Sequence, residues 1–292
     1  MDSASSTRAM RWLMGEQCQT LPADRQLARK LQRDMPWLEM SLLINRSFHF
    51  SSAAYFSQRL DIGQFITLSA GPYRPWPGPD AEMQPPCAAV PDAEFVHVYA
   101  LTGTGEGGTP CAHRHLQAGL HQMLGLLHHP ALEALDRRRP IGVLADDIGP
   151  LSESTADLRF GLDVLREWLP PGSAIALTHT TTDLLPAGRR AGVRARHDHA
   201  AKRARATGGT YQPRSLADVK SLLGPWPLLR TDQPVATGAF FPDHAYARLP
   251  EHHSGAYAAI ALHPQSLPSA GRRAAGTLGQ GQTSRTEQAG AR

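Results

Sequence analysis

The spacing of hydrophobic and polar residues along the chain predicts helices that alternate with short buried strands. Residues 23–33 have the apolar spacing of a helix, and residues 41–60 continue that spacing after a break at Pro36–Trp37. Apolar runs typical of buried strands occupy residues 62–68, 94–101, 141–145, 174–178 and 256–262. Helical spacing returns at residues 155–169, 194–206 and 215–223, and Ser215 is a candidate N-cap for the last of these helices.

Strands that alternate with helices predict an α/β fold in which a parallel sheet is covered on both faces. The helices before the first strand form an N-terminal helical extension to this sheet. Residues 71–92 are rich in Pro and Gly, so we expect a long loop without regular structure there. Residues 266–292 carry almost no large apolar side chains to offset the entropy of ordering, which predicts a disordered tail. We therefore expect one domain, residues 1–265, followed by that tail.

Charge and cysteine content limit the classes of partner and compartment. The formal net charge is +4, but the arginines are scattered, which does not favour a nucleic-acid interface. Cys18, Cys87 and Cys111 form no CxxC pair, so we predict neither a disulfide framework nor a cysteine zinc site. No apolar run approaches the roughly 18 residues of a membrane span, and no basic segment leads into an apolar core near the N-terminus. We expect a soluble cytoplasmic protein, and the sequence leaves its oligomeric state open.

Two groups of polar residues have spacings that suit ligands. His113 and His115 form an HxH pair, but no carboxylate or cysteine completes a zinc-binding spacing, so solvated histidines are favoured and no metal site is predicted. Asp146–Asp147 follows a predicted strand, at the end where parallel sheets bind ligands. Paired aspartates also stabilise turns, so a ligand role and a structural role are equally favoured for this pair.

Residues 103–108 read Gly-Thr-Gly-Glu-Gly-Gly and match the dinucleotide pattern GxGxxG after a predicted strand. No acidic residue ends a second strand about 20 positions later, where it would bind a ribose. A surface turn is therefore favoured over an NAD or nucleotide site.

Eight short segments are individually weak signals, but their order and spacing are specific. They are Arg11–Glu16, Pro22–Arg25, Pro36–Leu38, Asn45–Phe48, Gly63–Ile66, His129–Pro130, Pro170–Ser173 and Thr178–Asp183. Over about residues 8–264, the chain resembles the small S-adenosylmethionine-dependent methyltransferases that are abundant in actinomycetes. The resemblance implies a Rossmann-like class I methyltransferase sheet, S-adenosylmethionine as cofactor and an unidentified small molecule as methyl acceptor. It also implies a cofactor cleft lined by Gly15, Asn45, Arg46, Ser69, Gly71, Tyr99, His115 and Leu116.

The cofactor segments depart from the family pattern at their charged positions. By the resemblance, Thr67 replaces an aspartate and Ser69 a glycine after the first strand, and Tyr99 stands where a ribose-binding acid ends the second strand. His115 stands where the family has another aspartate. A hydrogen bond to a charged group contributes about 1.5–3 kcal/mol, so the loss of two acids weakens cofactor binding about 10²- to 10⁴-fold. Two hypotheses remain: an active methyltransferase, or an inactive homologue with a binding or regulatory role whose cleft is filled by Tyr99 or His115.

Overall fold

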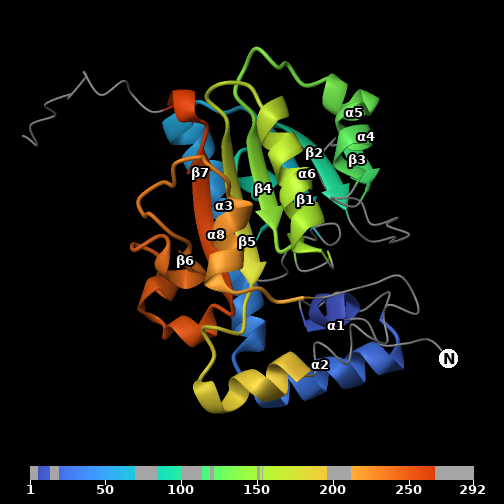
Figure 1. The fold of residues 1–292 in the computed structure, drawn as a ribbon, viewed down its shortest axis with the longest axis vertical. Helices are drawn as coiled ribbons and strands as arrows, with labels where there is room; N and C mark the ends of the chain where they lie inside the picture. Colours follow the sequence, from blue (N-terminus) through green and yellow to red (C-terminus); the bar gives the residue numbers. More distant parts are fainter. Residues whose placement is uncertain are drawn as a thin grey trace, which may run out of the picture.

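One mixed sheet forms the centre of the molecule (Figure 1). The computed structural model describes residues 6–13, 20–69, 84–99, 114–118, 122–149, 152, 154–195 and 212–266. Within these residues the strands form a seven-stranded sheet in the order β3-β2-β1-β4-β5-β7-β6. Their bounds are β1 Gln64–Ser69, β2 Glu94–Tyr99, β3 Arg114–Gln117, β4 Gly142–Asp146, β5 Ala174–Thr180, β6 Val235–Ala236 and β7 Ala256–Leu262.

The strand directions correct one part of the prediction. β1 to β5 are parallel, as expected, but β7 pairs antiparallel with both β5 and β6. Every residue of β7 is buried, and a strand buried on both faces has the same apolar composition whichever way it runs. The sequence pattern therefore predicted the strand but not its direction.

Helices surround the sheet, and the first of them form an N-terminal extension. Their bounds are α1 Ser6–Leu13, α2 Pro22–Asp34, α3 Leu38–Leu60, α4 Met123–Leu127, α5 Pro130–Glu133, α6 Thr155–Trp168 and α8 Leu216–Leu222, with a further helix at 187–195. Short 3₁₀ turns occupy η2 Pro86–Ala89, η5 Thr237–Ala239, η6 Ala245–Arg248, η7 Glu251–His253 and η8 Pro264–Ser266.

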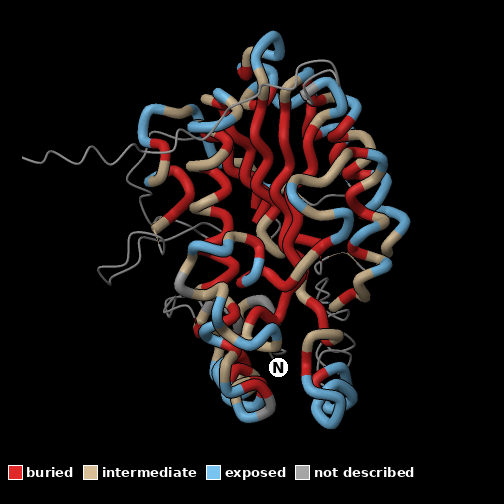
Figure 2. The backbone as a smooth tube through the Cα atoms, turned by 90° about the vertical axis from the view of Figure 1, so that its left-hand side faces the viewer, coloured by how far each residue is buried: buried red, intermediate tan, exposed pale blue. Residues whose placement is uncertain are grey.

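Two hydrophobic layers hold the helices on opposite faces of the sheet. On one face Phe48 and Phe56 of α3 pack with Phe65 and Phe95 of the strands. On the other face the strands pack against α4, α6 and α8 through a cluster of leucines, isoleucines and valines. Figure 2 shows the strands buried in the centre, with exposed segments around them. These layers confirm the predicted α/β fold with helices on both faces.

The N-terminal helices form a third apolar cluster at the carboxyl ends of the parallel strands (Figure 1). Leu31 of α2 and Leu38 of α3 pack there with Leu185 and with Val193 of the 187–195 helix. Asp24, which is fully buried, holds α1 to α2 because its carboxylate accepts hydrogen bonds from Arg8 and from the backbone of Leu21. The predicted N-terminal extension is therefore confirmed, and it lies over the edge of the sheet where ligands bind.

Several local predictions differ from the structure or lie beyond the described residues. Part of the predicted 71–92 loop is regular, because Pro86, whose fixed φ suits a helix start, begins η2. The 187–195 helix begins seven residues before the predicted 194–206 helix, whose remainder from 196 onward is not among the described residues. The predictions for the 103–108 glycine pattern, for most of the loop and for the tail beyond 266 also fall outside them.

Candidate functional site

A row of polar side chains crosses the sheet at the carboxyl ends of its parallel strands. Cross-strand pairing aligns Tyr99 of β2 with Ser69 of β1, Ser69 with Asp146 of β4, and Asp146 with Thr178 of β5. Residues in one row of a parallel sheet project from the same face. From β1 the chain continues to β2 and β3 on one side of the sheet, and from β4 it continues to β5 on the other side. The strand order therefore reverses between β1 and β4, and open α/β sheets bind ligands at such a switch point. The row is therefore the expected place for a cofactor.

Helix α3 adds a buried imidazole to this row. The Nε2 atom of His49 lies 2.9 Å from Thr178 Oγ1 and 3.6 Å from Asp146 Oδ1. Burial lowers the pKa of His49, while the nearby Asp146 carboxylate opposes that shift in part. His49 is therefore uncharged at neutral pH. Its Nδ1 atom has no hydrogen-bond partner among the described residues.

The two adjacent aspartates have different environments. Asp147 has φ = 46° and accepts hydrogen bonds from Thr180 N at 2.6 Å and Thr180 Oγ1 at 2.7 Å. These contacts tie the end of β4 to the end of β5, so the structural role predicted as one alternative belongs to Asp147. The Asp146 side chain remains 20% exposed in the polar row. The Asp146 carboxylate is therefore partly accessible to a ligand, whereas the Asp147 carboxylate is bonded to Thr180.

Tyr99 and His115 contact each other at the edge of the sheet. Their rings lie 5.6 Å apart, and Tyr99 Oη lies 2.7 Å from His115 Nδ1. The stack continues into the core through His97, whose Nδ1 lies 2.6 Å from Thr67 Oγ1. Tyr99 is buried and His115 is exposed, so the imidazole covers the tyrosine from the solvent side.

The other predicted cleft residues are distributed over several places. Leu116 follows His115 on β3 but packs against the hydrophobic cluster on the opposite face of the sheet, because successive side chains of a strand alternate. Asn45 and Arg46 are both buried on α3, and only Asn45 lines the pocket described below. Gly15 and Gly71 are outside the described residues.

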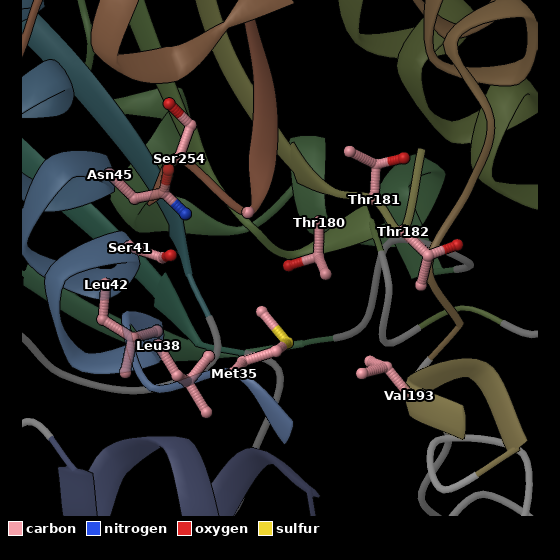
Figure 3. Close-up of a pocket in the computed structure, with 11 residues that line it drawn as sticks. Met35, Leu38, Ser41, Leu42, Asn45, Thr180, Thr181, Thr182, Val193 and Ser254 are labelled. Carbon is pink, nitrogen blue, oxygen red and sulfur yellow. The ribbon is translucent and has the colours of Figure 1, made fainter. Parts of the chain in front are cut away.

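A pocket opens beside the polar row, at the ends of β5 and β7 (Figure 3). Met35, just after the end of α2, helix α3 and the 187–195 helix supply its other walls. Its lining consists of Met35, Leu38, Ser41, Leu42, Asn45, Thr180, Thr181, Thr182, Val193, Ser254 and Gly255. Figure 3 shows the apolar side chains on one side and the hydroxyl and amide groups on the other.

A buried arginine and a buried histidine link β5 to the segment that follows β4. Arg214 donates to the backbone oxygens of Gly149 and Ser152, both at 2.8 Å, and its NH1 lies 3.1 Å from His179 Nε2. His179 Nδ1 lies 2.9 Å from Thr180 O. Burial, with a smaller contribution from the Arg214 charge, lowers the pKa of His179 to about 3. A neutral His179 that donates from Nδ1 and accepts at Nε2 satisfies both contacts.

Sequence reasoning did not identify His49 or Arg214 as site residues. His49 lies one helical turn after Asn45, so helical spacing carried a usable signal. Arg214 had no such signal, because its partners are distant in sequence. No group of three or more His, Cys, Asp or Glu that could hold a metal occurs in the part of the chain that the structure describes. No described helix is long and apolar enough to cross a bilayer, and the cytoplasmic location stays a prediction.

Comparison with known proteins identifies the family. Residues 1–264 match the family model of the S-adenosyl methyltransferases. The chain belongs to this family. The match confirms the family predicted from the resemblance and its cofactor, S-adenosylmethionine. None of the curated proteins matches the chain.

Solved structures share the fold of this S-adenosyl methyltransferase family member. A DUF574 family protein from Streptomyces avermitilis has 22% sequence identity and a TM-score of 0.68, covering 90% of this chain and 98% of its own. A protein from Thermobifida fusca, described as a candidate methyltransferase, has 19% identity and a TM-score of 0.67, covering 89% and 95%. These likenesses confirm the Rossmann-like class I fold that was predicted.

The polar row offers suitable partners for the family's cofactor. The hydroxyl groups of Ser69 and Tyr99 can donate to and accept from ribose hydroxyls. The Asp146 carboxylate can pair with the ammonium group of the cofactor's amino acid part. The unpartnered Nδ1 of buried His49 also indicates a polar ligand group near this row, because buried polar atoms normally have partners. The residues present therefore fit S-adenosylmethionine, with uncharged groups at β1 and β2.

Proposed function

We propose that this chain is an active S-adenosylmethionine-dependent methyltransferase whose acceptor is a small molecule. The supporting observation is the row of Tyr99, Ser69 and Asp146 at the switch point of the sheet. In this proposal Ser69 and Tyr99 bind the ribose and Asp146 binds the ammonium group. Arg46, His115 and the glycines Gly15 and Gly71 remain proposed cofactor-cleft residues, and Leu116 contributes through packing. Asn45, first expected in this cleft, lies in the wall of the neighbouring pocket.

Asp146 offsets part of the missing charge. One hydrogen bond to a charged group contributes about 1.5–3 kcal/mol, or about 10- to 150-fold in affinity. That contribution replaces the binding free energy of at most one of the two acids that the cofactor segments lack. The bound cofactor supplies a methyl group already activated by its sulfonium, so alignment of the acceptor can provide most of the rate enhancement. The protein therefore needs a shaped, water-excluding pocket more than a strong general base.

The Tyr99–His115 contact favours a second candidate function, an inactive homologue that binds another ligand. If the two rings keep their contact when ligand is present, the position of the ribose acid stays closed. A binding or regulatory protein would then use the neighbouring pocket without methyl transfer.

Calorimetric titration of the purified chain with S-adenosylmethionine and S-adenosylhomocysteine separates the two functions. The methyltransferase proposal expects binding in the micromolar range for both compounds. An absence of heat with millimolar ligand would overturn it and support the inactive homologue.

A further inference from the structure

The pocket of Figure 3 lies next to the proposed cofactor row. Thr180 in its wall is two residues beyond Thr178 of the row, and Asn45 is one helical turn before His49. Adjacent strands are about 4.8 Å apart, so the end of β5 is about 10 Å from β1. A molecule in the pocket therefore lies beside the proposed cofactor site.

The pocket has no charged wall. Among the described residues that line it there is no Asp, Glu, Lys, Arg or His. Most of the hydroxyl groups are already engaged: Thr180 Oγ1 donates to Asp147 Oδ2, while Thr182 Oγ1 and Ser254 Oγ accept from Arg194 and Gly238 N. A carboxylate or ammonium group would lose its hydration here without gaining an ionic partner. The pocket therefore disfavours the zwitterionic end of the cofactor and favours an uncharged ligand.

One buried polar atom of the pocket wall has no hydrogen-bond partner among the described residues. This atom is Oδ1 of Asn45, a residue that is only 6% exposed. Figure 3 shows the Asn45 side chain on the pocket wall, on the same helix as Leu38 and Leu42. An amide can both donate and accept, and leaving it unpaired in a buried position is unfavourable. A ligand that donates to and accepts from this amide removes that penalty.

We infer that this pocket binds the methyl acceptor and that the acceptor is an uncharged molecule with an apolar body and one polar group held by Asn45. The inference rests on the proposed function, because only methyl transfer makes the occupant an acceptor. Met35, Leu38 and Val193 contact the apolar body, and Asn45 sets its orientation. Asn45 thus selects for ligands that carry a carboxamide, hydroxyl or similar neutral group.

Three probes of nearly equal size test the charge preference. Benzamide, benzoate and benzylammonium are titrated into the full chain and followed by NMR, with and without saturating S-adenosylhomocysteine. We expect benzamide to bind at least tenfold more tightly than either charged probe and to shift the Asn45 side-chain NH₂ signals. Equal affinities, or benzamide shifts that spare the Asn45 signals, would overturn the inference. The signal shift is measured on the unaltered protein, so it does not depend on a variant that folds.

A matched pair of variants tests the role of Asn45. Asn45→Leu removes the amide at similar size, and Ser52→Ala removes another unpartnered buried group of α3 that does not line the pocket. Asn45→Leu is expected to weaken benzamide binding at least tenfold, because the hydrogen bonds are lost, whereas Ser52→Ala leaves it unchanged. Unchanged binding in Asn45→Leu would contradict the inference.

The titrations with and without S-adenosylhomocysteine distinguish a failure of this inference from a failure of the proposed function. We expect benzamide to bind equally well or better when S-adenosylhomocysteine is present. Competition between the two compounds would place the pocket within the cofactor site and overturn the acceptor assignment. Benzamide binding through Asn45 in a protein that binds no S-adenosylhomocysteine would instead overturn the methyltransferase proposal and identify a binding protein.

Discussion

At the scale of single residues, two neighbouring aspartates have separable roles. Asp146 lies partly exposed in the polar row, and Asp147 is bonded to Thr180. Asp146→Asn is expected to weaken S-adenosylmethionine binding about 10- to 150-fold with little change in stability, since it removes the charged partner. Calorimetric titration with the cofactor measures this change, and an unchanged dissociation constant would exclude Asp146 from the site.

Asp147→Asn is the matched control at the adjacent position. Asparagine tolerates the positive φ of this residue, so the backbone is preserved while the charge-assisted hydrogen bonds to Thr180 are weakened. We expect a loss of about 1–2 kcal/mol in the free energy of unfolding, measured by urea denaturation, and a smaller effect on cofactor affinity than Asp146→Asn. A larger loss of cofactor affinity in Asp147→Asn than in Asp146→Asn would contradict the roles assigned to the two aspartates.

Single-residue patterns also explain what could be predicted of the site. The resemblance identified Ser69 and Tyr99 because both stand at the ends of largely apolar strands, whose positions are evident from the sequence. It could not show that Tyr99 bonds to His115, because β3 is a short and largely exposed edge strand with little apolar signal. Asn45 was predicted as a cleft residue, but only the folded structure shows that its buried Oδ1 has no hydrogen-bond partner among the described residues.

At the scale of elements, helix α8 begins at the N-cap that the sequence predicted. Ser215 Oγ accepts from Asp218 N, and the Asp218 carboxylate accepts in turn from Ser215 N, so the structure completes a capping box around the predicted N-cap. Ser215→Ala is expected to reduce the free energy of unfolding by about 1 kcal/mol, because a capping hydrogen bond is lost. Urea denaturation measures the change. Ser221→Ala on the same helix is the control, because it removes a serine hydroxyl that bonds within the helix and leaves the Ser215 N-cap intact. Equal losses would show that capping is not the cause.

At the scale of the whole molecule, buried histidines make stability depend on pH. The folded state lowers the pKa of His179 from 6.5 to about 3, so the unfolded chain binds a proton more tightly between these values. Stability is therefore complete above about pH 6.5 and falls as the pH decreases toward 3. At 1.36 kcal/mol per pH unit, the loss at pH 5 is about 2 kcal/mol. The lowered pKa of His49 acts in the same direction.

Urea denaturation at pH 7.5 and pH 5.0 checks this dependence. His179→Gln keeps a side chain that donates and accepts but does not titrate, so it should reduce the difference between the two pH values. His128, an exposed residue, provides the control through His128→Gln, which should leave the difference unchanged. A full pH difference in His179→Gln would assign the effect to other groups.

The sequence by itself determined the main elements and the family of this protein. Helix α6 shows the helical spacing of a buried face, and the strands β1 and β4 are short continuous apolar runs, as expected for strands covered on both faces. The order of the matching segments likewise depends only on the linear chain. Both kinds of information are local or sequential, so they can be read without the fold.

Only the tertiary structure decided how those elements combine into a site. It set the antiparallel direction of β7, the polar row across four strands and the uncharged pocket around Asn45. Each of these depends on residues that are far apart in the chain, such as His49 and Thr178, which are separated by 129 positions. A buried polar group is favourable or unfavourable according to the partners that folding brings to it, and the sequence pattern does not contain those partners.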